Sequence, residues 1–152
     1  MANNTIVLRG TKETQETAIA SGSVYPGHLV EPTSAADTYK VHAVAGGGGP
    51  ACFAIEDELK GNDIDDVYAT TSRMQIYFAK PGDVIYVKIA NGEDIAIADK
   101  LVSNGNGEFK EHTKDSSATI VEQHVFGYAM DAVDMSASSG KDPSGWCRMR
   151  VI

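Results

Sequence analysis

The chain of 152 residues has the size of a single domain built around one hydrophobic core. Hydrophobic residues make up 42% of it and charged residues 22%, which excludes a disordered or fibrous protein. Thirteen basic residues against twenty-one acidic ones give a formal net charge of -8, so we expect neither nucleic acid nor an anionic membrane as a partner. The early apolar run at residues 6–8 is too short for a signal peptide, so we expect synthesis in the cytoplasm.

The first twenty residues differ from the rest of the chain. A short apolar stretch, Thr5 to Arg9, precedes Gly10 to Thr17, which is polar and has no aromatic residue. This pattern predicts an N-terminal arm over residues 1–20, either ordered against a partner or frayed in solvent, followed by a single domain over 21–152.

The rest of the chain alternates between apolar and polar residues, which is typical of strands. We expect strands at residues 39–45, 73–78 and 83–90, the last two joined into a hairpin by a turn over Lys80, Pro81, Gly82 and Asp83. Further strands are predicted at 95–101, 120–134 and 146–152, and a mobile loop at 134–145. The stretch 125–133 is long enough for a helix, but Gly127 and its aromatic and β-branched neighbours favour a strand.

Short strands separated by Gly-rich turns predict an all-β fold, a barrel or a sandwich. The two cysteines, Cys52 and Cys147, are far apart in the sequence and are expected to be buried thiols. Arg148 and Arg150 form the one close pair of basic residues and are expected on the face of their strand opposite Cys147.

Motifs that carry chemistry are absent from the sequence. Gly46 to Gly49 lead into Pro50 rather than into the Lys-Ser or Lys-Thr of a phosphate loop. They are expected to form a flexible loop, or a place where another chain approaches closely near a symmetry axis. The acidic residues 62–66 lack the spacing of a calcium loop, and the four histidines lack that of a zinc site. We therefore expect no metal, no cofactor and no enzymatic activity, although a triad assembled by the fold stays open.

A series of turn signatures and strand patterns runs through residues 24–152. Its pieces are Pro26-Gly27-His28-Leu29-Val30-Glu31, Val41-His42-Ala43, the Gly-rich turn, residues 51–59 followed by Gly61, residues 64–68, the turn around Pro81-Gly82-Asp83, residues 101–107, and Arg148-Met149-Arg150-Val151-Ile152. The order of these segments resembles that of the capsid decoration, or cement, proteins of tailed bacteriophages.

This resemblance implies a non-enzymatic virion protein with a compact β-barrel or β-tulip-like body and an extended N-terminal arm. It implies a homotrimer on the outer surface of the capsid, bound to the major capsid protein where capsomers meet and stabilising the shell. We expect the arm to bind the capsid by strand addition through Thr5, Ile6, Val7, Leu8 and Arg9. The expected trimer interface consists of Gly46, Gly47, Gly48, Gly49, Pro50, Phe53, Ile55 and Leu59.

Two alternatives remain open. One is another virion β protein, from a tail tube or associated with a fibre, which shares the absence of catalytic motifs. The other is a carbohydrate-binding β module, in which Trp146 and Tyr25, Tyr39, Tyr77 and Tyr86 would stack on sugars. We favour core or interface roles for most of these rings, because several lie within the strand patterns.

Overall fold

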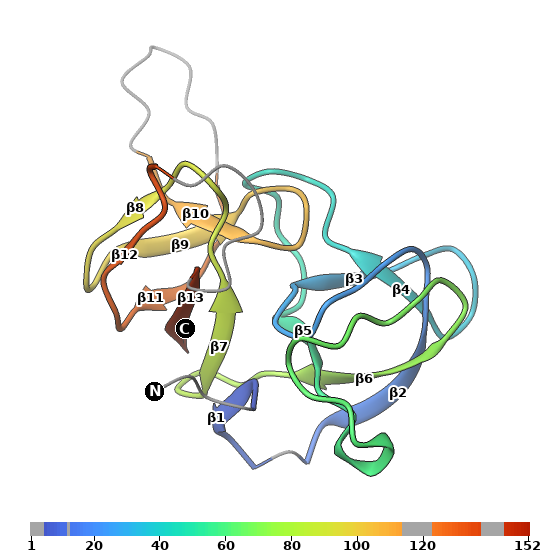
Figure 1. Ribbon diagram of the computed structural model, residues 1–152. Coiled ribbons are helices and arrows are strands. Elements are labelled where there is room, and N and C mark those ends of the chain that lie inside the picture. The colour runs from blue at the N-terminus through green and yellow to red at the C-terminus, as the bar shows by residue number, and fades with distance from the viewer. Residues whose placement is uncertain (1–4, 12, 114–122, 138–144) are drawn as a thin grey trace.

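The computed structural model describes residues 5–11, 13–113, 123–137 and 145–152, and shows them as strands joined by turns (Figure 1). The helical element among these residues is one 3-10 turn, η1 (Glu58–Lys60). The predicted all-β class is therefore confirmed. None of the described helical structure is long and apolar enough to span a membrane.

A six-stranded antiparallel sheet forms one half of the molecule. Its strand order is β1 (Val7–Arg9), β7 (Val84–Lys88), β13 (Trp146–Val151), β11 (Val125–Ala129), β9 (Lys100–Ser103) and β10 (Phe109–Glu111). An isolated bridge between Ile89 and Phe109 brings the last strand back beside the end of β7. The sheet is thus strongly curled, but the described ladders do not close into the expected barrel. A two-stranded ribbon, β8 (Asp94–Ile95) with β12 (Val133–Asp134), lies beside it.

A five-stranded mixed sheet forms the other half, to the right in Figure 1. Its order is β3 (Val30–Pro32), β4 (Thr38–Val41), β2 (Gln15–Ala20), β6 (Arg73–Phe78) and β5 (Cys52–Ile55). Strand β2 lies in the middle, parallel to β4 and antiparallel to β6.

Strand β5 is buried on both faces and divides its side chains between two cores. Phe53 and Ile55 belong to the larger core, which lies between the sheets, whereas Cys52 and Ala54 belong to a smaller one on the other face. The Phe53 ring stacks on Phe109 of the six-stranded sheet with ring centroids 6.1 Å apart. Because side chains alternate along a strand, four consecutive buried residues serve both cores at once.

The structure differs from the expectation of a separate arm over residues 1–20. Ile6 and Val7 are buried in the larger core, β1 pairs with β7, and β2 lies at the centre of the second sheet. The backbone N–H of Ile6 donates to the buried Glu56 carboxylate at 2.9 Å, and the Thr5 hydroxyl donates to the same group. The sequence signal was weak because β2 buries only two alanines.

The turn at residues 80–83 is present, but the predicted hairpin is wrong. The Asp83 N–H donates to the Lys80 carbonyl at 3.0 Å, and Gly82 has a φ of 95°, which favours glycine. Strands β6 and β7, however, belong to different sheets. The turn bonds instead to the end of β13, where the Gly82 N–H donates to the Val151 carbonyl at 2.8 Å.

The ambiguous stretch 125–133 begins with a strand, as the sequence favours. At Gly127 a Cβ atom would lie 2.3 Å from the Arg150 carbonyl oxygen, so β11 approaches β13 at a distance only glycine allows. The predicted strand at 120–134 and loop at 134–145 extend in part over residues outside the described ones.

The role of Phe53 in joining the sheets yields a stability prediction. We expect Phe53→Ala to lower the free energy of unfolding by about 3–5 kcal/mol, because it removes buried area and leaves a cavity between the sheets. Ile97→Ala, at a side chain that is 67% exposed, is the control and should change stability by less than about 0.5 kcal/mol. Chemical denaturation measures both, and equal midpoints would refute the prediction.

Candidate functional site

A groove of about 730 Å³ lies on the outer face of the six-stranded sheet. It crosses β1, β7, β13 and the residues after β11. The register of β7 and β13 determines which side chains line the groove, because Val84 pairs with Arg150 and Tyr86 pairs with Arg148. These side chains lie on the face of the sheet opposite the core side chains of Ile85 and Met149. The groove residues are Leu8, Arg9, Val84, Tyr86, Met130, Asp131, Arg148 and Arg150.

Three of the four arginines of this acidic chain line the groove. Arg148 is held by Asp131, whose carboxylate accepts from the guanidinium Nε at 2.9 Å and from the Arg148 backbone N–H at 3.0 Å. The side-chain hydrogen bond from Arg148 lowers the pKa of Asp131. Arg9 and Arg150 are exposed, and neither has an acidic partner among the described residues. Among the described residues, the groove therefore presents two positive charges without an acidic partner, beside the partly exposed side chains of Leu8 and Met130.

The rings proposed for sugar stacking are largely used inside the protein. Trp146 is 8% exposed and stacks on Tyr86 with centroids 4.9 Å apart, while the Lys88 ammonium lies 5.1 Å from the Trp146 ring. Tyr77 is fully buried, and its hydroxyl donates to Asp83 at 2.6 Å. The preference for structural roles is confirmed for Trp146 and Tyr77.

The Gly-rich segment packs against the end of the six-stranded sheet. The Gly46 N–H donates to the Ser103 carbonyl at 2.8 Å, and the Gly46 carbonyl accepts from the His124 N–H at 2.9 Å. Gly48, Gly49 and Pro50 are exposed, and Gly47 is half-buried. These residues are thus held in place by their own chain while part of their surface stays accessible.

The remaining residues of the expected trimer interface separate into core and surface. Phe53 and Ile55 are at most 1% exposed within the larger core, so another subunit cannot reach them without opening it. Leu59, in contrast, is 97% exposed on η1. The difference from expectation arises because β5 ends at Ile55 and the chain then leaves the sheet.

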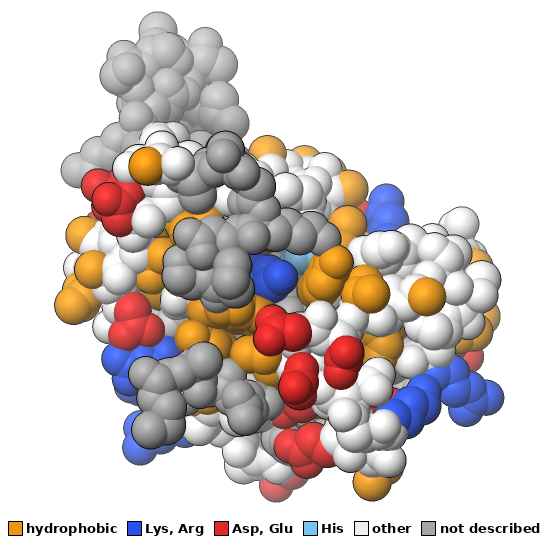
Figure 2. Space-filling model, viewed as in Figure 1, with side chains coloured by type: hydrophobic (Ala, Val, Ile, Leu, Met, Phe, Trp, Pro, Cys, Tyr) orange, Lys and Arg blue, Asp and Glu red, His pale blue; other side chains and the backbone are white. Residues whose placement is uncertain are grey.

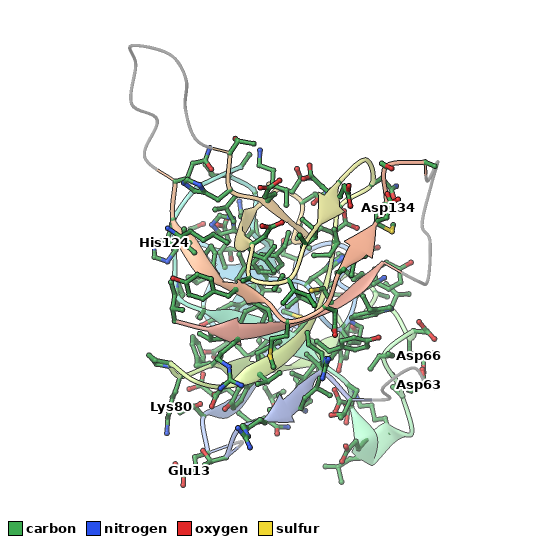
Figure 3. All side chains as sticks on the ribbon, turned by 90° about the vertical axis from the view of Figure 1, so that its left-hand side faces the viewer. Glu13, Asp63, Asp66, Lys80, His124 and Asp134 are labelled. Carbon is green, nitrogen blue, oxygen red and sulfur yellow. The ribbon has the colours of Figure 1, made fainter. Side chains whose placement is uncertain are left out.

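Leu59 lies on an acidic loop, residues 58–67. Glu58, Asp63, Asp65 and Asp66 are exposed on it, and Figure 3 shows Asp63 and Asp66 close together at the right-hand edge of the molecule. The loop is fixed by the buried side chain of Ile64 and by short-range bonds, in which the Asp63 N–H donates to the Asp66 carboxylate at 3.0 Å. It therefore presents a preformed acidic surface with an apolar tip.

The fold also brings together a serine, a histidine and a carboxylate. Nδ1 of His42 lies 2.8 Å from the Ser103 hydroxyl, and its Nε2 lies 3.6 Å from a Glu31 carboxylate oxygen. Ser103 is completely buried, and its hydroxyl also accepts from the Gly105 N–H at 3.1 Å. A nucleophile must reach its substrate, so this cluster is better suited to joining β4, β9 and the Gly-rich segment than to catalysis.

Both cysteines are buried free thiols, as expected, and burial raises the pKa of each. Among the described residues no group of three His, Cys, Asp or Glu side chains is placed to hold a metal ion.

Sequence reasoning found part of the groove and missed the rest. The alternation Arg148-Met149-Arg150 predicts two arginines on one strand face, and the structure confirms this placement. Arg9 and Asp131 join them only through the pairing of β1 with β7 and the position of the turn after β11. No local pattern encodes that arrangement.

The sequence matches no protein-family model and no curated protein. Among solved structures, the chain is similar to one described as the head fiber gp8.5 N base in bacteriophage phi29. The match has a TM-score of 0.55 at 17% sequence identity and covers 91% of this chain and 92% of the other. At that identity the likeness establishes a shared fold over nearly the whole of both chains.

The Ser103 cluster predicts a structural penalty. Ser103→Ala leaves His42 Nδ1 and the Gly105 N–H without a buried partner, so we expect a loss of about 1–3 kcal/mol in the free energy of unfolding. Ser72→Ala removes an exposed serine hydrogen bond and serves as the matched control, with an expected change under about 0.5 kcal/mol. A stability for Ser103→Ala equal to that of the control would contradict a structural role.

The Arg148–Asp131 pair predicts a pH effect. Because the pKa of Asp131 is lowered in the folded state, its stabilising contribution is complete above the ordinary carboxyl pKa and is lost as the pH falls through the lowered value. We expect Arg148→Gln to raise the pKa of Asp131 toward the ordinary value of 3.8, as measured by carboxyl NMR titration. An unchanged titration would show that another group lowers it.

Proposed function

We propose that this protein is a non-enzymatic structural component of a tailed-bacteriophage virion that binds the outer surface of the head as a decoration, or cement, protein. The observation that carries the proposal is the fold shared over 91% of the chain with the phi29 head fiber gp8.5 N base. The strand and turn patterns that resemble decoration proteins support it from an independent direction, since they come from the sequence.

The surfaces of the chain suit binding to a protein shell. The net charge of -8 opposes contact with the packaged genome, while the basic groove and the acidic loop give opposite charges to different faces. Figure 2 shows acidic side chains gathered over the segment between β5 and β6, and basic ones at both the lower left and the lower right edges. In a homotrimer, weak contacts with several capsid subunits would act together through effective concentration.

Two parts of the proposal rest on the sequence and remain predictions: the trimer, with Gly46 to Pro50 and Leu59 at its interface, and contact of residues 5–9 with the major capsid protein. Thr5, Ile6 and Val7 are engaged within the chain, which leaves Leu8, Arg9 and the open edge of β1 for any such contact. Deletion of the N-terminal residues as far as β2 would remove the central strand of the five-stranded sheet. Substitutions within residues 5–9 therefore test this contact better than such a deletion.

The proposal predicts binding to phage heads. Light scattering of the purified protein should give three times the subunit mass of 16.1 kDa, and the protein should sediment with undecorated expanded heads. Heads that carry it should resist heating better than bare heads. The control is the protein centrifuged without heads, which should stay in the supernatant. A folded wild-type protein that also stays there when heads are present would refute the function.

A second candidate, the base of a head fibre, is favoured by the same structural match. Electron microscopy can distinguish a decoration protein from a fibre base, if the heads carry the protein in the form that the phage produces. A compact knob supports decoration, whereas a knob that continues into a projecting fibre supports a fibre base. A tail-tube subunit would instead form rings or tubes at high protein concentration.

A further inference from the structure

The acidic loop and the basic groove have matching properties on one chain. The loop carries four exposed carboxylates around the protruding Leu59, and the groove carries Arg9 and Arg150 beside the apolar side chains of Leu8, Val84 and Met130. The side chain of an exposed leucine contributes favourable free energy when an apolar contact removes it from water. The arginines offer charge-assisted hydrogen bonds to carboxylates.

The two surfaces cannot meet within one subunit. Figure 1 places η1 below the five-stranded sheet, whereas the groove lies on the outer face of the six-stranded sheet, with β13 and β11 beyond β7 as seen from η1. The loop is anchored by Ile64 in the larger core and by Tyr68, whose hydroxyl donates to the Ile55 carbonyl at 2.7 Å. Both surfaces are therefore fixed and face different directions.

We propose that the acidic loop at residues 58–67 of one copy docks in the Arg9–Arg150 groove of the next copy, with Leu59 against Leu8 and Met130. Two different patches on each subunit form a head-to-tail contact, which closes into a ring when the rotation between subunits allows it. This deepens the assembly proposed above, on which it rests, and assigns Leu8 and Arg9 to contact between copies rather than to contact with the shell.

Asp131 sets the chemistry of the groove. Its carboxylate accepts hydrogen bonds from both the guanidinium and the backbone N–H of Arg148. The negative charge of Asp131 thereby offsets the positive charge of Arg148 in the groove. Arg9 and Arg150 are left to meet the carboxylates of the incoming loop. On the loop, Asp63 and Asp66 accept backbone hydrogen bonds that shape it, so the test leaves these two residues unchanged and substitutes Glu58 and Asp65.

The test is reversal of charge on each side and then on both. The groove variant Arg9→Glu with Arg150→Glu, and the loop variant Glu58→Lys with Asp65→Lys, should each lower the solution mass toward the 16.1 kDa monomer in light scattering. The variant with all four substitutions should regain the wild-type mass, because complementarity is restored with the signs exchanged. Circular dichroism and thermal unfolding confirm that each variant is folded.

Controls separate docking from a general charge effect. Lys100→Glu with Lys110→Glu, on β9 and β10, changes the net charge as much as the groove variant and should keep the wild-type mass. Leu59→Asp should dissociate the assembly without any change in the groove. Three results would each overturn the proposal: a monomeric wild-type protein, a groove variant that keeps the wild-type mass, or a variant with all four substitutions that stays dissociated.

Sedimentation with heads distinguishes this inference from the proposed function. A wild-type protein that assembles through the groove but does not bind heads would refute the function and leave the docking intact. A groove variant that keeps its mass but no longer binds heads would assign the groove to an acidic segment of the shell and refute docking between copies.

Discussion

The burial of β5 on both faces is the constraint on which the rest of the structure depends. Its side chains point alternately into the larger core and the smaller core, so both cores are built on this one strand. At the end of this strand the chain turns into Glu56, whose buried carboxylate is bonded by Thr5 and Ile6 at the start of β1. A buried carboxylate is costly unless its oxygens accept hydrogen bonds, so this contact fixes the residues before β1 in one sheet against the residue that follows β5 in the other.

Local alternation predicted the fold class and several strands, but not their partners. Residues 73–78 and 84–88 form strands as expected, and the turn between them has the geometry that Pro81 and Gly82 favour. Their separation into two sheets depends on β13, which is distant in sequence and captures the turn through backbone bonds. Strands with weak patterns, such as the alanine-containing β2, form because their neighbours bury them, and no local signal of useful strength encodes that.

The candidate surfaces show the same division. The sequence identified Arg148 and Arg150 as a pair on one face, and it identified Leu59 within a segment expected at an interface. It placed Phe53 and Ile55 in the same expected interface, whereas the fold buries both in the larger core. The distinction between the exposed Leu59 and the buried Phe53, six residues away, is set by where β5 ends, which is a property of the sheet.

The position of β13 also governs the order in which the protein can be made. This strand lies between β7 and β11, yet it is the last described strand to leave the ribosome. Until then the edges of β7 and β11 lack their common neighbour, and the larger core lacks the side chains of Cys147, Met149 and Val151. Non-local pairing of this kind is slow and leaves unpaired edges exposed in the nascent chain. The six-stranded sheet therefore stays incomplete until β13 is synthesised. During that period its unpaired strand edges are open to wrong pairing with strands of neighbouring nascent chains.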